Sequence, residues 1–148
     1  MDKTDIKILN ILHNRGRITN KRLSEKIGLN PSSTLERVNK LEARGIIKGY
    51  SANIDMEKLG YGTIAFIQVS LKRHNKDNII SFLKDLEKIE ELVEYYHIAG
   101  QYDYMLKVHV KTNKDLQRFL IEKITSLQLI DKTETMLVFE EKKLKINL

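Results

Sequence analysis

Hydrophobic residues near the start of the chain recur at the spacing of helix turns. Between residues 4 and 13, Ile6, Leu9 and Leu12 repeat every third position, which is typical of one apolar face on an amphipathic helix. Gly16 follows in a polar segment and supplies a turn, so the first predicted helix ends before it.

A second, shorter helix is predicted between residues 19 and 27 by the residues that flank it. Thr19 is a good N-cap, because its hydroxyl can accept a hydrogen bond from an unpaired amide of the first turn. Ile18 and Leu23 occupy the two positions of a hydrophobic staple around this cap. Gly28 then stands where a helix often ends in a left-handed residue.

The third predicted helix starts almost at once and runs to residue 43 or 44. Asn30 can cap it, and Pro31 occupies the first helical position, where its missing amide costs no hydrogen bond. Three apolar residues at three-residue spacing are expected to face inward: Leu35, Val38 and Leu41. A two-turn helix, a three-residue turn with glycine and a longer helix together predict a helix-turn-helix unit.

The distribution of charge indicates a partner for this unit. The chain of 148 residues has a net charge of +6, and residues 1–60 hold 12 Lys and Arg against 7 Asp and Glu. The first 60 residues therefore carry +5, and the remaining residues carry only +1. A basic segment on a nearly neutral body favours a polyanion such as DNA.

After residue 62 the pattern changes to strands that alternate with helices. Strands are expected at 63–72, 92–99, 104–111 and 133–140, and helices at 77–89 and 113–127. The first strand alternates, with Ala65, Ile67 and Val69 on one face, and Asn113 is the expected cap of the last helix. The order βαββαβ predicts an α+β chain whose C-terminal part is a ferredoxin-like sandwich.

The two patterns divide the chain into three parts. Residues 1–50 are expected to form a helix-turn-helix, winged-helix-like domain, and residues 63–148 the ferredoxin-like domain, to which the family resemblance described below assigns oligomerisation and effector binding. Residues 51–62 lie between them and are expected to form an extended linker or a short β-ribbon, with glycines near the boundary.

The outward face of the third helix carries the candidate base-reading groups. A major groove suits short hydroxyl or amide groups near the helix N-terminus and long basic side chains further along. The candidate DNA-binding residues are Arg17, Thr19, Lys21, Asn30, Ser32, Ser33, Thr34, Glu36, Arg37 and Lys40. Four further basic residues could flank the groove as phosphate contacts: Arg15, Arg22, Arg44 and Lys48. The alternative is a solvated helix face in a small structural bundle.

The segment Gly100–Asp103 joins two predicted neighbouring strands and has two interpretations. Gly and Asp are common in hairpin turns, so a simple turn explains it. Alternatively, Asp103 and the loop amides could bind the ammonium and carboxylate groups of a small zwitterion.

Several classes of protein find no support in the sequence. The chain has no Cys, and His97 and His109 lack a metal-ligand spacing and are expected on strand surfaces. No catalytic triad order or glycine-rich phosphate loop occurs, so we expect neither a cofactor nor an enzyme. No apolar run is long enough for a membrane helix, and a cytoplasmic protein is expected.

Taken together, the motifs resemble those of the Lrp/AsnC family of transcriptional regulators, also called feast/famine regulatory proteins. Five segments are similar to the N-terminal signature of the family, in its order and spacing: Asp5–Leu9, Arg17–Thr19, Leu29–Ser32, Arg37–Glu42 and Gly45–Tyr50. Ile98–Tyr104 resembles the Gly-x-Tyr-Asp turn of the family, and Thr133–Met136 resembles its final strand.

This resemblance implies a homodimer built through the ferredoxin-like domains, which often assembles further into tetramers or octamers. It also implies pseudo-palindromic promoter sites in double-stranded DNA and an amino-acid effector bound between dimers. The effector-site residues that it implies are Gly100, Gln101, Tyr102, Asp103, Thr133 and Thr135. One departure concerns Glu36, where relatives often carry a basic residue; it could accept from a cytosine amine or pair with Lys40.

Two other functions remain open at this point. Siroheme decarboxylases resemble this family and use the same fold for chemistry on a tetrapyrrole, but such an enzyme needs no basic DNA-reading face. An architectural DNA-binding protein without an effector is the third possibility, and it would show steep salt dependence with little sequence preference.

Overall fold

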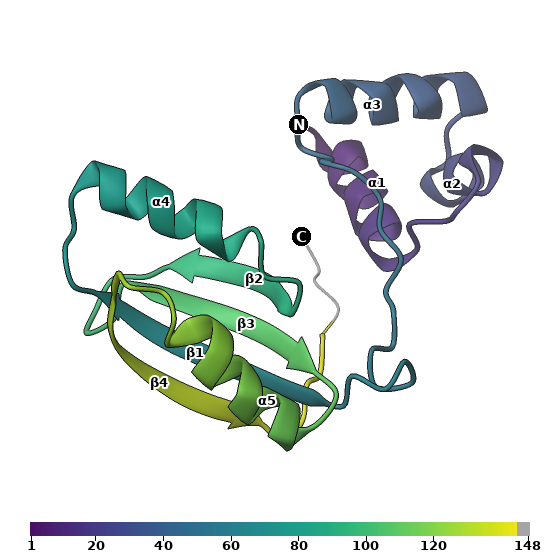
Figure 1. Cartoon of the computed structure of the whole chain (residues 1–148). Coiled ribbons are helices and arrows are strands. Elements are labelled where there is room, and N and C mark those ends of the chain that lie inside the picture. Colours follow the sequence, from purple (N-terminus) through teal and green to yellow (C-terminus); the bar gives the residue numbers. More distant parts are fainter. Residues whose placement is uncertain (145–148) are drawn as a thin grey trace. The chain divides into compact units, whose positions relative to one another are not determined.

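The computed structural model describes residues 1–144 and divides the chain into two compact units (Figure 1). The N-terminal unit consists of Met1–Ile54 together with the segment that begins at Lys142. The second unit spans Asp55–Glu141.

Three helices build the N-terminal unit, as the hydrophobic spacing predicts. They are α1 (Lys3–Asn14), α2 (Asn20–Ile27) and α3 (Pro31–Ala43). One side chain or more from each helix enters a shared hydrophobic cluster of Ile8, Leu23, Val38 and Leu41. Because each helix is short, this shared burial, and not helix propensity, holds the three together.

Polar caps fix where these helices begin. Thr19 accepts a hydrogen bond from the Arg22 amide, and Asn30 accepts one of 2.7 Å from the Ser33 amide, which confirms both predicted caps. Gly28 ends α2 with φ of 79°, a left-handed conformation that favours glycine. At α1 the cap is a reciprocal pair that the sequence analysis missed, in which Asp2 and Asp5 each accept from the amide of the other.

The rotation of α3 about its axis differs from the sequence prediction. Thr34 is fully buried and its hydroxyl donates to the Asn30 carbonyl, whereas Leu35 is 49% exposed. The predictions that Leu35 faces inward and that Thr34 faces DNA are therefore wrong. Positions 34, 38 and 41 fall on one side of the helix, and position 35 lies about 100° away from position 34.

Extended chain, not a β-ribbon, connects the two units. No strand occurs among the described residues between Arg44 and Gly62; the backbone is extended and then turns at residues 56–60. The expected β-ribbon is therefore absent from residues 51–62, and the change from one unit to the other falls between Ile54 and Asp55.

The second unit is a four-stranded antiparallel sheet with two helical segments on one face (Figure 1). Its strands are β1 (Thr63–Leu71), β2 (Leu92–His97), β3 (Tyr104–Val110) and β4 (Ile130–Val138), in the spatial order β2-β3-β1-β4. Helix α4 (Lys76–Leu86) follows β1, and α5 (Asn113–Phe119) follows β3. This arrangement confirms the ferredoxin-like prediction.

The core of this unit lies between the sheet and its helices. Alternate residues of β1, including Ala65, Ile67 and Val69, are fully buried, as their spacing predicts. Phe82 of α4 is also fully buried and packs its ring 5.2 Å from that of Tyr104. The large aromatic side chain therefore joins α4 to the centre of the sheet.

The last helical segment begins and ends differently from the prediction. Thr112, not Asn113, is its cap and accepts a hydrogen bond from the Asp115 amide at 3.1 Å. After Phe119 the chain continues as a π-helix, η1 (Leu120–Ile124). Both Thr and Asn are good caps, so adjacent candidates could not be separated by residue type alone.

Replacing Phe82 with alanine should lower the free energy of unfolding by about 3–5 kcal/mol, because it leaves a cavity between α4 and the sheet. Tyrosine fluorescence during urea unfolding measures this loss, since Tyr104 contacts the Phe82 ring. The matched control is Ile121→Ala, whose side chain is 63% exposed and should change stability by no more than about 0.5 kcal/mol. Equal losses from the two variants would contradict the packing described.

Candidate functional site

The exposed face of α3 carries a mixed set of polar and apolar side chains. Ser32, Leu35, Glu36 and Asn39 are exposed, while Ser33 is half-buried at its side. The structure therefore presents Ser32, and in part Ser33, as the hydroxyls available near the helix N-terminus. Leu35 and Asn39 are two exposed positions that the sequence analysis did not assign to the interface.

Glu36 and Lys40 pair along this face. The Lys40 ammonium lies 2.6 Å from a Glu36 carboxylate oxygen, and its hydrogen bond lowers the pKa of Glu36. Of the two expected roles for Glu36, pairing with Lys40 is the one observed. Both side chains are about two-thirds exposed, so water screens the pair and Lys40 is able to turn toward a phosphate.

Arg37 makes a different contact from the one its sequence position suggests. One of its guanidinium nitrogens lies 2.7 Å from a carboxylate oxygen of Asp2 and 2.7 Å from one of Asp5. The arginine is thus held against the first turn of α1 and acts as a brace between α1 and α3. A DNA phosphate would have to compete with two carboxylates for this side chain.

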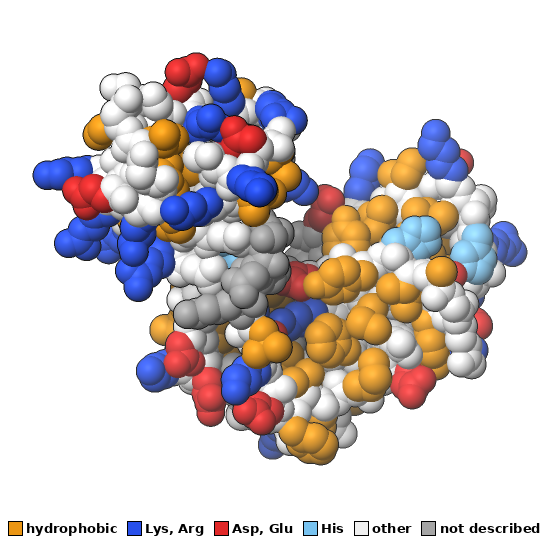
Figure 2. Space-filling view, turned by 180° about the vertical axis from the view of Figure 1, so that it is seen from behind, with side chains coloured by type: hydrophobic (Ala, Val, Ile, Leu, Met, Phe, Trp, Pro, Cys, Tyr) orange, Lys and Arg blue, Asp and Glu red, His pale blue; other side chains and the backbone are white. Residues whose placement is uncertain are grey.

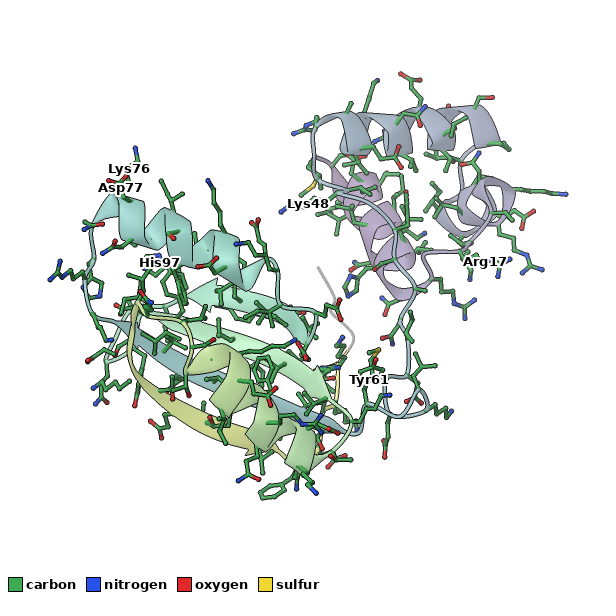
Figure 3. All side chains as sticks on the ribbon, in the orientation of Figure 1. Arg17, Lys48, Tyr61, Lys76, Asp77 and His97 are labelled. Atoms are coloured by element: carbon green, nitrogen blue, oxygen red, sulfur yellow. The ribbon has the colours of Figure 1, made fainter. Side chains whose placement is uncertain are left out.

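Further basic side chains surround α2 and α3, and no acidic partner holds them among residues 1–144. The exposed candidates for phosphate contact are Arg15, Arg17, Lys21, Arg22, Arg44 and Lys48. Figure 3 shows Arg17 on the α2 side of the unit and Lys48 where the linker leaves α3, and Figure 2 shows Lys and Arg gathered over this unit. Thr19 and Asn30 are exposed as well, but each uses its oxygen as a helix cap.

The Gly100–Asp103 turn connects β2 and β3 as expected, and Asp103 fastens it to β1. The Asp103 carboxylate accepts from the Leu71 amide at 2.7 Å and lies 2.9 Å from the His74 imidazole. Partial burial would raise the pKa of Asp103, but the hydrogen bonds from Leu71 and His74 lower it. This carboxylate is therefore ionised and already engaged within the chain. In Figure 3, His97 lies at the same end of the sheet, near the first turn of α4.

The remaining effector candidates lie on two faces of the sheet. Tyr102 donates to Glu134 at 2.9 Å, whereas Thr133 and Thr135 pair with buried positions of β1 and so point to the helix-bearing face. Because strand residues alternate between faces, Glu134 points to the opposite face, and Tyr102 reaches it there from the turn. Within one chain, Tyr102 and the two threonines do not line one pocket.

The sheet face opposite the helices is rich in apolar side chains. Register and alternation place six there: Ile64, Phe66, Tyr96, Met105, Met136 and Val138. Figure 2 shows hydrophobic side chains gathered over this face of the second unit. Tyr96 is 46% exposed and Met136 is 39% exposed, so a substantial apolar surface meets solvent in the single chain.

The histidines do not form a metal site in the part of the chain that is described. No group of three or more His, Cys, Asp or Glu residues there could hold a metal ion. His109 is buried, contrary to the expectation of a strand-surface residue, and His97 stacks on Tyr104 at 4.8 Å. Among residues 1–144, no helix has the length and hydrophobicity needed to cross a membrane.

A helix-turn-helix unit with an exposed polar recognition helix, joined to a separate ferredoxin-like unit, defines a class of DNA-binding transcriptional regulators. Family models agree: "Lrp/AsnC ligand binding domain" matches residues 64–148, and "Winged helix-turn-helix DNA-binding" matches residues 1–48. The chain belongs to the Lrp/AsnC family.

Individual relatives match over nearly the whole chain. The leucine-responsive regulatory protein of Escherichia coli is 36% identical over 143 residues, which cover 97% of this chain and 87% of that protein. A transcriptional regulator from Neisseria meningitidis, solved as a complex with L-Met, has a TM-score of 0.93 and 34% identity, covering 100% of this chain and 96% of that one. AsnC of Escherichia coli has a TM-score of 0.87 and 31% identity, covering 99% and 97% of the two chains.

Removing both carboxylates that hold Arg37, in Asp2→Asn/Asp5→Asn, should flatten the pH dependence of stability of the N-terminal unit. Hydrogen bonds from backbone amides and from Arg37 lower the pKa of both groups in the folded chain. The two carboxylates stabilise the folded chain fully above the pKa of an aspartate in the unfolded chain, about 3.9. This stabilisation is lost as the pH falls through their lower pKa values in the folded chain. Helical circular dichroism during urea unfolding, measured from about pH 6 to about pH 2.5, follows this change.

Asparagine can still cap a helix, so the variant tests the ion pairs more than the capping. At neutral pH the variant should unfold at lower urea than the parent. Asp55→Asn, which changes an exposed aspartate of the second unit, serves as the control and should keep the parental pH profile. A double variant with the parental profile would show that Arg37 is not braced by these carboxylates in solution.

Proposed function

We propose that this protein is a sequence-specific, DNA-binding transcriptional regulator that acts as a homodimer and responds to an amino-acid effector. The observation that carries the proposal is the exposed polar face of α3, held at a fixed angle by α1 and α2 and flanked by basic side chains. In this geometry α3 enters the major groove, and residues near its N-terminus meet base edges.

The individual roles follow from position and chemistry. Ser32 and Ser33 lie in the first turn of α3, where hydroxyls can reach base edges. Lys40, Lys21 and Arg17 are exposed and suited to phosphates. Arg37 contributes by bracing α3, and Thr34 by anchoring it.

A homodimer follows from the apolar sheet face. Burying that face against its copy in a second chain would remove a large hydrophobic surface from water through a two-fold interface. A two-fold dimer presents two copies of α3 about 34 Å apart, one helical turn of DNA, and so selects pseudo-palindromic sites. Further assembly of dimers into tetramers or octamers is part of this proposal.

An amino-acid effector fits the second unit. The similar Neisseria meningitidis regulator was solved with L-Met, and the similar Escherichia coli protein is named leucine-responsive. In this chain, Tyr102 and the threonines Thr133 and Thr135 lie on different sheet faces. A pocket that uses both sets therefore requires a second copy of the chain, which would couple effector binding to assembly.

These roles divide along the chain. Residues 1–50 bind DNA, residues 51–62 form the extended linker, and residues 63–148 assemble the protein and bind the effector. The tetrapyrrole-decarboxylating enzyme and the architectural DNA-binding protein are the alternatives. The matched relatives are transcriptional regulators, which argues against the enzyme.

Selection of bound genomic fragments by the purified protein, at two salt concentrations, tests the proposal with Lys40→Ala as the variant. The parent should enrich a symmetric motif, and the variant should bind all fragments more weakly, with a salt slope reduced by about 1. Lys84→Ala, in the last turn of α4, is the control and should bind like the parent. Repeating the selection with L-methionine or L-leucine should change affinity or assembly.

Different failures point to different alternatives. Weak binding without a motif at either salt concentration would favour the architectural protein. Absence of DNA binding together with uptake of a coloured tetrapyrrole would favour the enzyme. An unchanged motif, affinity and mass with every amino acid would remove the effector from the proposal.

Phe66→Lys should convert the dimer to a monomer, because it places a second cation, opposite the paired Lys107, among the apolar residues of this sheet face. Light scattering coupled to size exclusion measures the mass. Ile121→Lys places the same charge on an exposed apolar position of η1 and should leave the mass unchanged. A Phe66→Lys protein that stays dimeric would show that another surface joins the copies.

A further inference from the structure

Leu35 is an apolar side chain on the polar face of α3 that the fold does not explain. It is 49% exposed, and it is the one large exposed hydrophobic residue that the structure describes on this helix. It takes no part in the hydrophobic cluster of the N-terminal unit, whose α3 members are Val38 and Leu41. Burial in the core therefore does not account for a leucine at this position.

Asn39 lies one helix turn further along the same face. Its side chain is exposed, and within residues 1–144 no hydrogen bond engages its amide. A side-chain amide offers one donor and one acceptor side by side, which matches N7 and the N6 amine of adenine in the major groove. Leucine offers only apolar surface, and the apolar group in the major groove is the methyl group of thymine.

The spacing of the two side chains suits neighbouring base pairs. Residues four apart in a helix share a face and are separated by about 6 Å along its axis. Bases on one strand are about 3.4 Å apart, so this distance covers about two steps. Glu36, the exposed residue next to Leu35, lies 2.6 Å from Lys40 in the free protein, whereas no ion pair or hydrogen bond in the described part of the chain engages the side chains of Leu35 and Asn39.

We propose that Leu35 and Asn39 form a base-reading pair that makes each half-site depend on A·T base pairs, with Leu35 against thymine methyl groups and Asn39 bonded to adenine. This inference rests on the proposed function, since it assigns the base specificity of the same helix. It adds a chemical requirement that neither the helix-turn-helix geometry nor the basic flank provides.

Replacing thymine by deoxyuridine in the bound DNA tests the leucine contact, because the change removes only the methyl group. The probe is the fragment that binds most tightly in the selection described above, substituted one thymine at a time. Fluorescence anisotropy should show about a fourfold loss of affinity for the parent at the contacted thymine. Leu35→Ala should bind the thymine and deoxyuridine probes equally.

The asparagine contact is tested in the same way with 7-deaza-adenine, which lacks the N7 acceptor. The parent should lose affinity at one or two adenines near the sensitive thymine, and Asn39→Ala should be indifferent to the change. Leu59→Ala, which removes another exposed leucine outside α3, is the matched control and should keep the parental response to both modified bases.

The outcomes separate this inference from the function on which it rests. Selective binding of a motif in which no thymine or adenine responds to modification would overturn the base-reading pair and leave the regulator intact. A Leu35→Ala protein that remains fourfold sensitive to deoxyuridine would also overturn it. Binding without any sequence preference would overturn both proposals together.

Discussion

The rotation of α3 about its axis determines which side chains can meet a DNA base. Burial of Thr34, Val38 and Leu41 fixes that rotation, and the Asn30 cap fixes where the helix starts. A polar residue is part of this buried set because the Thr34 hydroxyl finds a partner in the Asn30 carbonyl. With these contacts in place, Ser32 and Asn39 lie on the exposed face of the helix and Leu35 lies half exposed at its side.

The ion pairs of Arg37 with Asp2 and Asp5 are a second constraint on the position of α3, because they join it to the start of α1. Two carboxylates of α1 hold a cation of α3, so part of the positive charge of the unit is neutralised inside it. The charge available to phosphates is therefore smaller than the excess of basic residues suggests, and it lies around α2, the end of α3 and the linker. The same residues stiffen the helix that has to enter the groove.

Local signals in the sequence predicted most of the fold, and contacts between distant residues account for what was missed. Helix caps such as Thr19 and Asn30, and the alternation of β1, depend on residues only a few positions apart, so the sequence predicted them. The bond between Arg37 and Asp2 joins positions 35 apart and has no spacing rule. The sequence analysis expected Leu35 to be buried and Thr34 to be exposed because apolar residues at three-residue spacing include position 35. In the structure Thr34 is buried instead, because its hydroxyl finds a hydrogen-bond partner inside the unit. Of the candidate effector residues, the sequence indicated the turn and the last strand, but the sheet faces to which their side chains point had no signal that could be read from the sequence.

The strand order of the sheet sets an order of events during synthesis. The central strand β1 pairs with β4 at positions as far apart as Ile64 and Val138, whereas the helices of the N-terminal unit contact one another within the first 43 residues. Contacts between nearby residues form sooner than contacts that close long loops. A nascent chain therefore acquires its helix-turn-helix well before the sheet can close. The four-stranded sheet therefore forms in full only after β4 has been translated.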